Sequence, residues 1–304
     1  MQAIDQVTLN FDPGAMAALN AIIALVIFGV ALDLRLADFR DLLRTPRALV
    51  LGFAAQFLYL PAVTLALVWL LQPPASIALG LFLVAACPSG NMSNFLTHHA
   101  RGNVALSVSL TGAATVLAMF ATPFNFALWS SLYLPTATLV RETSVATGEM
   151  MVTVLFLLVL PIVAGMLVSA FLPMLAARLR KPLRLAALVI FALFLVGALV
   201  ANWQIFIAHV GTVAWLVFLH NALALAGGYA IAALGGMAEP ERRAISIETG
   251  IQNSGLGLAL VFAFFNGLGG MAIVAAWWGI WHLISGYTLA SWFRSRPVAR
   301  VAPV

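Results

Sequence analysis

The chain has 304 residues, of which 63% are hydrophobic and only 8% charged, with a mean hydropathy of +1.05. Soluble domains carry about 25% charged residues, so 15 basic and 10 acidic side chains are too few to cover a surface of this size in water. The composition excludes a soluble protein and indicates that most of the surface faces lipid. The net charge of +5 then reports orientation in a bilayer rather than affinity for nucleic acid.

Apolar segments long enough to span a bilayer begin at about residue 15, and charged residues, proline or glycine mark each break between them. Residues 1–14 contain two aspartates and no basic residue, which predicts an external N-terminal tail. The sequence therefore predicts an all-α polytopic membrane protein with nine transmembrane helices. These span residues 15–34, 47–71, 75–100, 104–129, 149–173, 183–200, 205–234, 244–266 and 270–293.

The basic residues predict which side of the membrane is cytoplasmic. Fourteen of the 15 lysines and arginines fall in alternate connections and in the C-terminal tail, 295–304, whereas Arg141 lies in the opposite set. Cytoplasmic connections carry the excess of Lys and Arg. We therefore expect a multi-pass protein of the cell (inner) membrane, with its N-terminus outside and its C-terminus in the cytoplasm.

Two of the predicted helices are interrupted near their middle. Pro88 and Gly90 lie in the first break, 87–94, and Gly250 lies in the second, 248–255. Non-helical backbone is tolerated at membrane depth only inside protein or beside a water-filled cavity. The two breaks therefore mark a site.

Each break lies in the penultimate helix of its half of the chain, which predicts a transporter built from inverted repeats. The predicted repeats are residues 15–131, with four helices, and residues 149–294, with five. An external connection at 132–148 joins them. The first repeat then lacks its first helix.

Glu248 differs from the other nine acidic residues, which lie at termini, in connections or within about one turn of a helix end. A carboxylate at membrane depth costs at least about 2–3 kcal/mol and normally has a cation or proton as partner. No Lys or Arg lies in the interior of a predicted helix; Arg47 and Arg184 lie at helix ends. A metal cation, a titrating proton or a protonated resting state all remain open, and a neutral Glu248 in an inter-helix hydrogen bond is the structural alternative.

Uncharged oxygen donors accompany this carboxylate. Ser107 and Thr111 are four residues apart, so they share one face of a helix. Other such residues are Gln56, Ser93, Asn94, Gln252 and Asn253. Hydroxyl and amide oxygens with a single carboxylate suit a hard cation, and the single negative charge favours sodium over calcium. Each residue taken alone is also an ordinary hydrogen-bonding residue between membrane helices.

Three stretches of the chain resemble the bile acid:sodium symporter family, and the resemblance runs from about Ile22 to Arg294. The stretches are CPSGNMSN at 87–94, ARGNVALS at 100–107 and ETGIQNSGL at 248–256. The resemblance implies a core domain and a panel domain that move against each other, with two sodium sites behind crossed, broken helices.

The resemblance also implies roles for individual residues. The first sodium site is expected from Ser93, Asn94, Ser107, Thr111 and Glu248, and the second from Gln56, Glu248, Gln252 and the backbone carbonyls of Thr249 and Ile251. The substrate cavity is expected to involve Asn91, Asn253 and His282, with Ser254 at the start of the second half-helix.

The chain departs from the family pattern at two of these positions. Ser89 stands where the family commonly has glycine, and Asn91 stands where relatives often have a hydroxyl residue. We expect both differences to bear on substrate identity more than on ion binding.

These features predict a secondary active transporter that couples inward sodium movement to uptake of an organic anion, either bile-acid-like or a smaller carboxylate. Alternating access would carry the anion across the bilayer, and no obligatory protein partner is evident. The alternatives are a proton-coupled transporter, a sodium/proton antiporter or a non-transporting receptor. An intramembrane enzyme that uses Glu248 with His282 or Cys87 is a remote alternative, and we expect no enzymatic activity.

Overall fold

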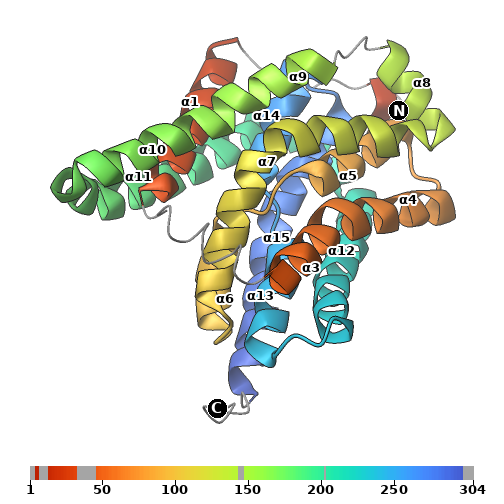
Figure 1. Cartoon of the computed structure of the whole chain (residues 1–304). Helices are drawn as coiled ribbons and strands as arrows, with labels where there is room; N and C mark the ends of the chain where they lie inside the picture. The colour runs from red at the N-terminus through yellow and green to blue at the C-terminus, as the bar shows by residue number, and fades with distance from the viewer. Residues whose placement is uncertain (1–3, 7–12, 33–45, 143–146, 202, 297–304) are drawn as a thin grey trace.

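A computed structural model describes residues 4–6, 13–32, 46–142, 147–201 and 203–296. These residues form helices, and no strand occurs among them (Figure 1). The expected all-α polytopic fold is confirmed. Most of the predicted N-terminal tail and the end of the predicted cytoplasmic tail, 297–304, lie outside the described residues.

Each of the nine predicted helices corresponds to one helix or to a run of consecutive helices. The elements are η1 (Ile4–Gln6), α1 (Pro13–Ala31), α3 (Pro46–Ala54), η2 (Ala55–Tyr59), α4 (Leu60–Leu71), α5 (Ala75–Ala86), α6 (Met92–His99), α7 (Val104–Ser131), α8 (Leu134–Glu142), α9 (Thr147–Val154), η3 (Leu155–Val159), α10 (Leu160–Phe171), α11 (Pro173–Ala201), α12 (Trp203–Leu234), α13 (Glu239–Gly250), α14 (Ser254–Phe265) and α15 (Gly269–Ser295).

Length and composition identify four described helices that could cross a membrane. They are Pro46–Leu71, Val104–Ser131, Gly148–Phe171 and Phe206–Leu234. Shorter apolar helices include Ala75–Ala86 and Ser254–Phe265, which are halves of the two interrupted segments, so each break leaves pieces too short to span alone. The total of nine spans stays a prediction.

Two predicted connections are partly helical. Helix α8 occupies 134–142 inside the expected external connection, and α11 begins at Pro173, well before the predicted start at 183. Proline is favoured in the first turn of a helix, and the Leu, Ala, Arg and Lys residues that follow Pro173 are good helix formers. The basic residues between 178 and 184, which suggested a connection, are compatible with a helix.

Two helices contain a single wide π-helical turn, which the sequence analysis did not predict. The turn η2 precedes Pro61, and η3 precedes Pro161. A proline inside a helix removes one amide donor and its ring clashes with the preceding turn, and a wider turn relieves that clash. Gln56, a predicted sodium ligand, is buried in η2.

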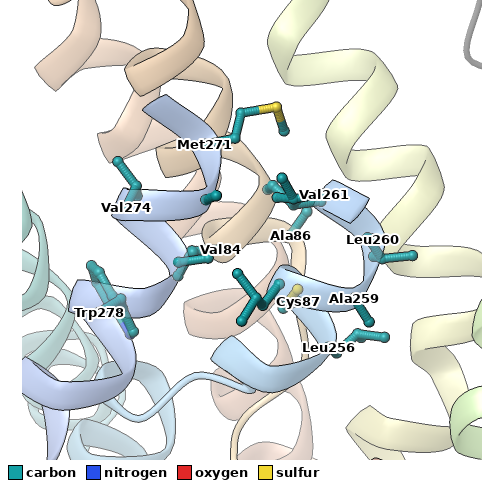
Figure 2. Close-up of a cluster of buried hydrophobic side chains, with 14 of the residues drawn as sticks. Val84, Ala86, Cys87, Leu256, Ala259, Leu260, Val261, Met271, Val274 and Trp278 are labelled. Carbon is teal, nitrogen blue, oxygen red and sulfur yellow. The ribbon is translucent and has the colours of Figure 1, made fainter. Parts of the chain in front are cut away.

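Helices α5, α14 and α15 share the largest buried apolar cluster (Figure 2). Members from these helices and the residue that follows α5 are Val84, Ala86, Cys87, Leu256, Leu260, Val274 and Trp278. Helix α12 packs against α13 and α15, whereas α1 packs against α10 and α11. One half of each interrupted segment, α5 and α14, therefore lies within the largest buried cluster.

The first described turn and the C-terminal end of α15 lie at opposite ends of the molecule (Figure 1). Ile4 is buried, and Asp5 Oδ1 accepts a hydrogen bond of 2.8 Å from the backbone amide of Ser76, near the start of α5. A carboxylate at this position also complements the positive end of the helix dipole. The described part of the predicted external tail thus packs against the core.

Candidate cation site at the helix breaks

The two helix breaks lie against each other and pair through their backbones. Ser89 and Gln252 form an isolated antiparallel bridge. Beside it, the Gly90 amide donates to the Ile251 carbonyl at 2.7 Å, and the Asn253 amide donates to the Pro88 carbonyl at 2.9 Å. Unpaired backbone groups are costly at membrane depth, and here each break supplies hydrogen-bond partners for the free backbone groups of the other.

The two breaks approach so closely that residue 90 must be glycine. A Cβ atom added to Gly90 would lie 2.8 Å from the backbone oxygen of Gln252 and 3.2 Å from its carbonyl carbon. Both atoms belong to the backbone, so neither can move without opening the bridge. Glycine at this position allows the two chain segments to approach.

The carboxylate of Glu248 lies beside this crossing, 4% exposed, and accepts hydrogen bonds from hydroxyl groups. Ser93 Oγ donates to Oε1 at 2.6 Å, and Ser107 Oγ donates to the same oxygen. Thr111 Oγ1 lies 3.0 Å from both Oε1 and Oε2. Within the described chain no lysine or arginine pairs with this carboxylate, so its charge is balanced by neutral dipoles alone.

Asn94 completes the predicted first site. Its Oδ1 lies 2.9 Å from Ser107 Oγ and 3.2 Å from Thr111 Oγ1, and each hydroxyl can direct its one hydrogen to this oxygen or to Glu248. The residues come from the first turn of α6, from α7 and from the end of α13. The structure thus brings together all five residues predicted for this site, and we call them the first cluster: Ser93, Asn94, Ser107, Thr111 and Glu248.

The residues predicted for the second site are also neighbours, but they bind one another. Gln56 Nε2 donates to Gln252 Oε1 at 2.9 Å, and Gln252 Nε2 donates back at 3.2 Å. Gln252 Nε2 also donates to the Thr249 carbonyl at 2.7 Å, while the Ile251 carbonyl accepts from the backbone of the other break. We call these four residues the second cluster. Among the residues that the structure describes, no hydrogen bond joins its side chains to Glu248.

The four residues predicted for the substrate cavity are less closely connected. Asn253 caps α14, because its Oδ1 accepts from the Leu256 amide at 3.1 Å. Ser254 packs against Gly279 of α15, one turn before His282. His282 is buried and its Nδ1 lacks a hydrogen-bond partner. Among the described residues no hydrogen bond joins His282 to Asn253, Ser254 or the half-buried Asn91.

Sequence reasoning missed the contact of Ser89 with the carboxylate. The side chain is buried, and its Oγ donates to Glu248 Oε2 at 2.5 Å. The departure from the family pattern at this position was expected to bear on substrate identity, whereas the contact is with the candidate cation site. The available signal was a hydroxyl residue between Pro88 and Gly90, inside a break that already contained the other ligands.

A buried arginine holds α13 at its N-terminal end. Arg243 donates to the carbonyls of Ala100 at 2.9 Å and Phe293 at 2.8 Å, and to Glu239 Oε1 at 2.8 Å. These carbonyls end α6 and lie in the last turn of α15, where a cation is favourable. Burial would raise the pKa of Glu239, but hydrogen bonds from Arg243 and Tyr229 outweigh it and hold that pKa below its ordinary value.

Comparison with known proteins identifies the family of this chain. Residues 21–209 match the model of the Sodium Bile acid symporter family. The chain belongs to this symporter family. The uncharacterized sodium-dependent transporter YocS of Bacillus subtilis is 35% identical over 275 residues, which cover 90% of this chain and 82% of that protein. The family resemblance drawn from the three motifs is therefore confirmed.

Other members of the symporter family share less of their length with this chain. The probable chloroplastic sodium/metabolite cotransporter BASS1 of Arabidopsis thaliana is 33% identical over 285 residues, or 90% of this chain and 66% of that protein. The human P3 protein is 30% identical over 241 residues, or 77% of this chain and 48% of that protein. Membership of the family makes this chain a sodium-coupled membrane transporter and not an enzyme.

Proposed function

We propose that this protein takes up a small organic anion together with sodium, by alternating access across the cell (inner) membrane. The observation that carries the proposal is Glu248, a buried carboxylate whose described partners are hydroxyl groups from the first break, from α6 and from α7. Such a group gains most from a small cation that can enter and leave with the transport cycle. A lysine or arginine paired permanently with this carboxylate could not leave it during the transport cycle.

The first cluster suits sodium. Its oxygens come from three hydroxyl groups, one amide and one carboxylate. Hard oxygen ligands favour alkali and alkaline-earth ions, and a single negative charge in the shell suits a monovalent ion better than calcium. Asn94 Oδ1 and the carboxylate already share the same two hydroxyl partners, Ser107 and Thr111, so little movement is needed to surround an ion.

The second cluster is proposed to hold a second sodium ion after rearrangement. The paired amides of Gln56 and Gln252 would separate so that their oxygens, the Thr249 and Ile251 carbonyls and Glu248 face one ion. Two helices, α5 and α13, end at the crossing. Helix C-terminal ends and unwound carbonyls favour cations.

Charge and helix ends support an anionic substrate. Two sodium ions beside one carboxylate leave one positive charge, and α6 and α14 begin at the crossing with their positive ends. We assign Asn91, Asn253, Ser254 and His282 to the substrate cavity. The assignment rests on the family resemblance, and the unpartnered Nδ1 of buried His282 leaves that atom able to bind a ligand.

Two inverted repeats, 15–131 and 149–294, would supply the moving parts, which we propose are a core domain and a panel domain. Helix α1 packs more extensively on α10 and α11 than on α14, which supports this division. An external N-terminus and a cytoplasmic C-terminus follow from the segregation of basic residues. The first described turn and the end of α15 lie at opposite ends of the molecule, which supports termini on opposite sides of the membrane.

A thermal-shift screen of carboxylates in sodium or potassium tests the proposal and narrows the substrate. A ligand that binds together with sodium raises the melting temperature only when both are present, because each stabilises the folded form that binds the other. Uptake into liposomes then measures transport of that ligand down an imposed sodium gradient. Equal uptake in potassium, or uptake that follows a proton gradient at constant sodium, would contradict the proposed coupling.

Glu248→Ala is the decisive variant. We expect the protein to fold, because it exchanges a buried charge for a small apolar side chain, and to lose sodium-dependent uptake and sodium stabilisation. Circular dichroism and size-exclusion chromatography check the fold. Sodium-coupled uptake at the wild-type level by this variant would be incompatible with the proposed site.

A further inference from the structure

Ser89 occupies a distinctive position among the residues around the buried carboxylate. Its backbone forms the bridge with Gln252, and its hydroxyl donates to Glu248 Oε2 at 2.5 Å. The side chain is 2% exposed. Because the bridge fixes the backbone, the hydroxyl loses little conformational freedom when it makes this bond.

The two oxygens of Glu248 have different partners. Oε1 accepts from Ser93 and Ser107, which belong to the first cluster, whereas Oε2 accepts from Ser89. Thr111 lies at equal distance from both oxygens, 3.0 Å. Ser89 is thus a partner of the oxygen that points away from Ser93 and Ser107.

Binding of a cation changes these partners in a predictable way. A hydroxyl oxygen that gives a lone pair to a cation directs its hydrogen away from that cation. Ser93 and Ser107 would therefore give up their hydrogen bonds to Oε1 when Oε1 shares an ion with them. Ser89 bonds the other oxygen, so its hydrogen bond is compatible with an empty and with an occupied first cluster.

We infer that Ser89 is a positioning residue that holds Glu248 Oε2 and thereby keeps Oε1 directed at the first cluster. The inference rests on the proposed sodium site. Ser89 also joins the first break to the end of α13, so the same bond helps to keep the two sides of the site together. A chain with glycine at this position has no such bond and needs more sodium to fill the site.

Sodium titrations of Ser89 variants test this inference. We expect Ser89→Ala and Ser89→Gly to raise the half-saturating sodium concentration about tenfold, because Glu248 Oε1 is then no longer held toward the first cluster. Maximal uptake at saturating sodium stays near the wild-type value. Ser89→Thr keeps a hydroxyl at this position and restores the wild-type titration. Glycine is the common family residue at position 89, so we expect Ser89→Gly to fold even if Ser89→Ala does not.

Ser246→Ala is the matched control. Ser246 is a buried serine on the same helix as Glu248, but its hydroxyl donates to the Leu225 carbonyl at 2.7 Å. Its replacement should lower the melting temperature and leave the sodium titration unchanged. A wild-type titration for Ser89→Ala or Ser89→Gly overturns the inference, and so does a threonine variant that folds yet titrates like alanine. Wild-type uptake without sodium would instead defeat the proposed function itself.

Discussion

Glu248 belongs to the first cluster and is proposed to serve the second as well, but the two clusters differ in how their polar groups are arranged. In the first cluster, hydroxyls from α6 and α7 converge on Glu248 and on Asn94. In the second, Gln56 and Gln252 satisfy each other, and the Ile251 carbonyl accepts a backbone hydrogen bond. In the first cluster the hydroxyls surround a charge that a cation would neutralise, whereas the second cluster consists of neutral groups that bind one another.

This difference predicts an order of binding. The first ion would exchange the hydroxyl hydrogen bonds of Glu248 for direct contact with its charge, whereas the second must separate the neutral amide pair of Gln56 and Gln252. In the proposed function both ions share Glu248, so filling one cluster is expected to change the affinity of the other. The following substitutions test the contributions of the crossing, the first cluster and the second cluster one at a time.

Gly90→Ala should have the largest effect, because it disrupts the crossing on which both clusters depend. The added Cβ meets the backbone of Gln252 at 2.8 Å, so we expect a destabilisation of about 1–3 kcal/mol and loss of sodium-dependent uptake. Melting temperature and liposome uptake measure the two effects. Gly257→Ala is the control, since its Cβ would lie 3.7 Å from Cys87 Sγ, an ordinary contact. Equal behaviour of the two variants would contradict the close-approach argument.

Thr111→Val should weaken the first cluster selectively. The change removes a hydroxyl that reaches both oxygens of Glu248 and keeps the side-chain volume nearly constant. We expect the half-saturating sodium concentration to rise about tenfold. Thr115→Val is the control one turn later on α7, because that buried hydroxyl donates to the Thr111 carbonyl at 2.6 Å and not to the carboxylate. Similar sodium titrations for both variants would argue against the first cluster.

Gln252→Leu should affect the second ion more than the first. If two ions bind cooperatively, the Hill coefficient of sodium-dependent uptake should fall from about two toward about one. Gln56→Leu should do the same, and the double variant should resemble either single one because the two side chains bind each other. Unchanged steepness in both single variants would restrict sodium binding to the first cluster.

The smallest expected effect concerns pH and the contact that anchors α13. The pKa of Glu239 lies below its ordinary value, so its contribution to stability is present above about pH 4.3 and is lost as the pH falls through the lowered pKa. Because the side chain is 27% exposed, we expect less than about 1 kcal/mol. The wild-type melting temperature should fall more steeply in acid than that of Glu239→Gln. Parallel curves would show that this carboxylate contributes nothing.

Much of the architecture could be predicted from local sequence signals. Long apolar runs gave the helical segments, and proline and glycine in the middle of two runs gave the breaks at 87–94 and 248–255. The convergence of the first cluster was predicted because one acidic residue at depth needs partners, and Ser107 and Thr111 are spaced by one turn. The family motifs then ordered these residues into sites.

What the sequence did not predict depends on contacts between distant segments. Ser89 and Glu248 are 159 residues apart, and nothing local indicates which carboxylate oxygen the hydroxyl meets. Gln56 lies in a π-helical turn whose signal was Pro61, but a proline can also kink or end a helix. The mutual pairing of Gln56 and Gln252 depends on side-chain rotation, which periodicity does not report.

The backbone bridge between the two breaks has an evolutionary consequence. Its hydrogen bonds come from peptide groups, so the scaffold of the crossing is largely independent of the side chains that it carries. Glycine and serine can therefore exchange at residue 89, or one amide can replace another at 252, while the crossing persists. A family with such a site can change its ion affinity one substitution at a time without passing through an unfolded ancestor.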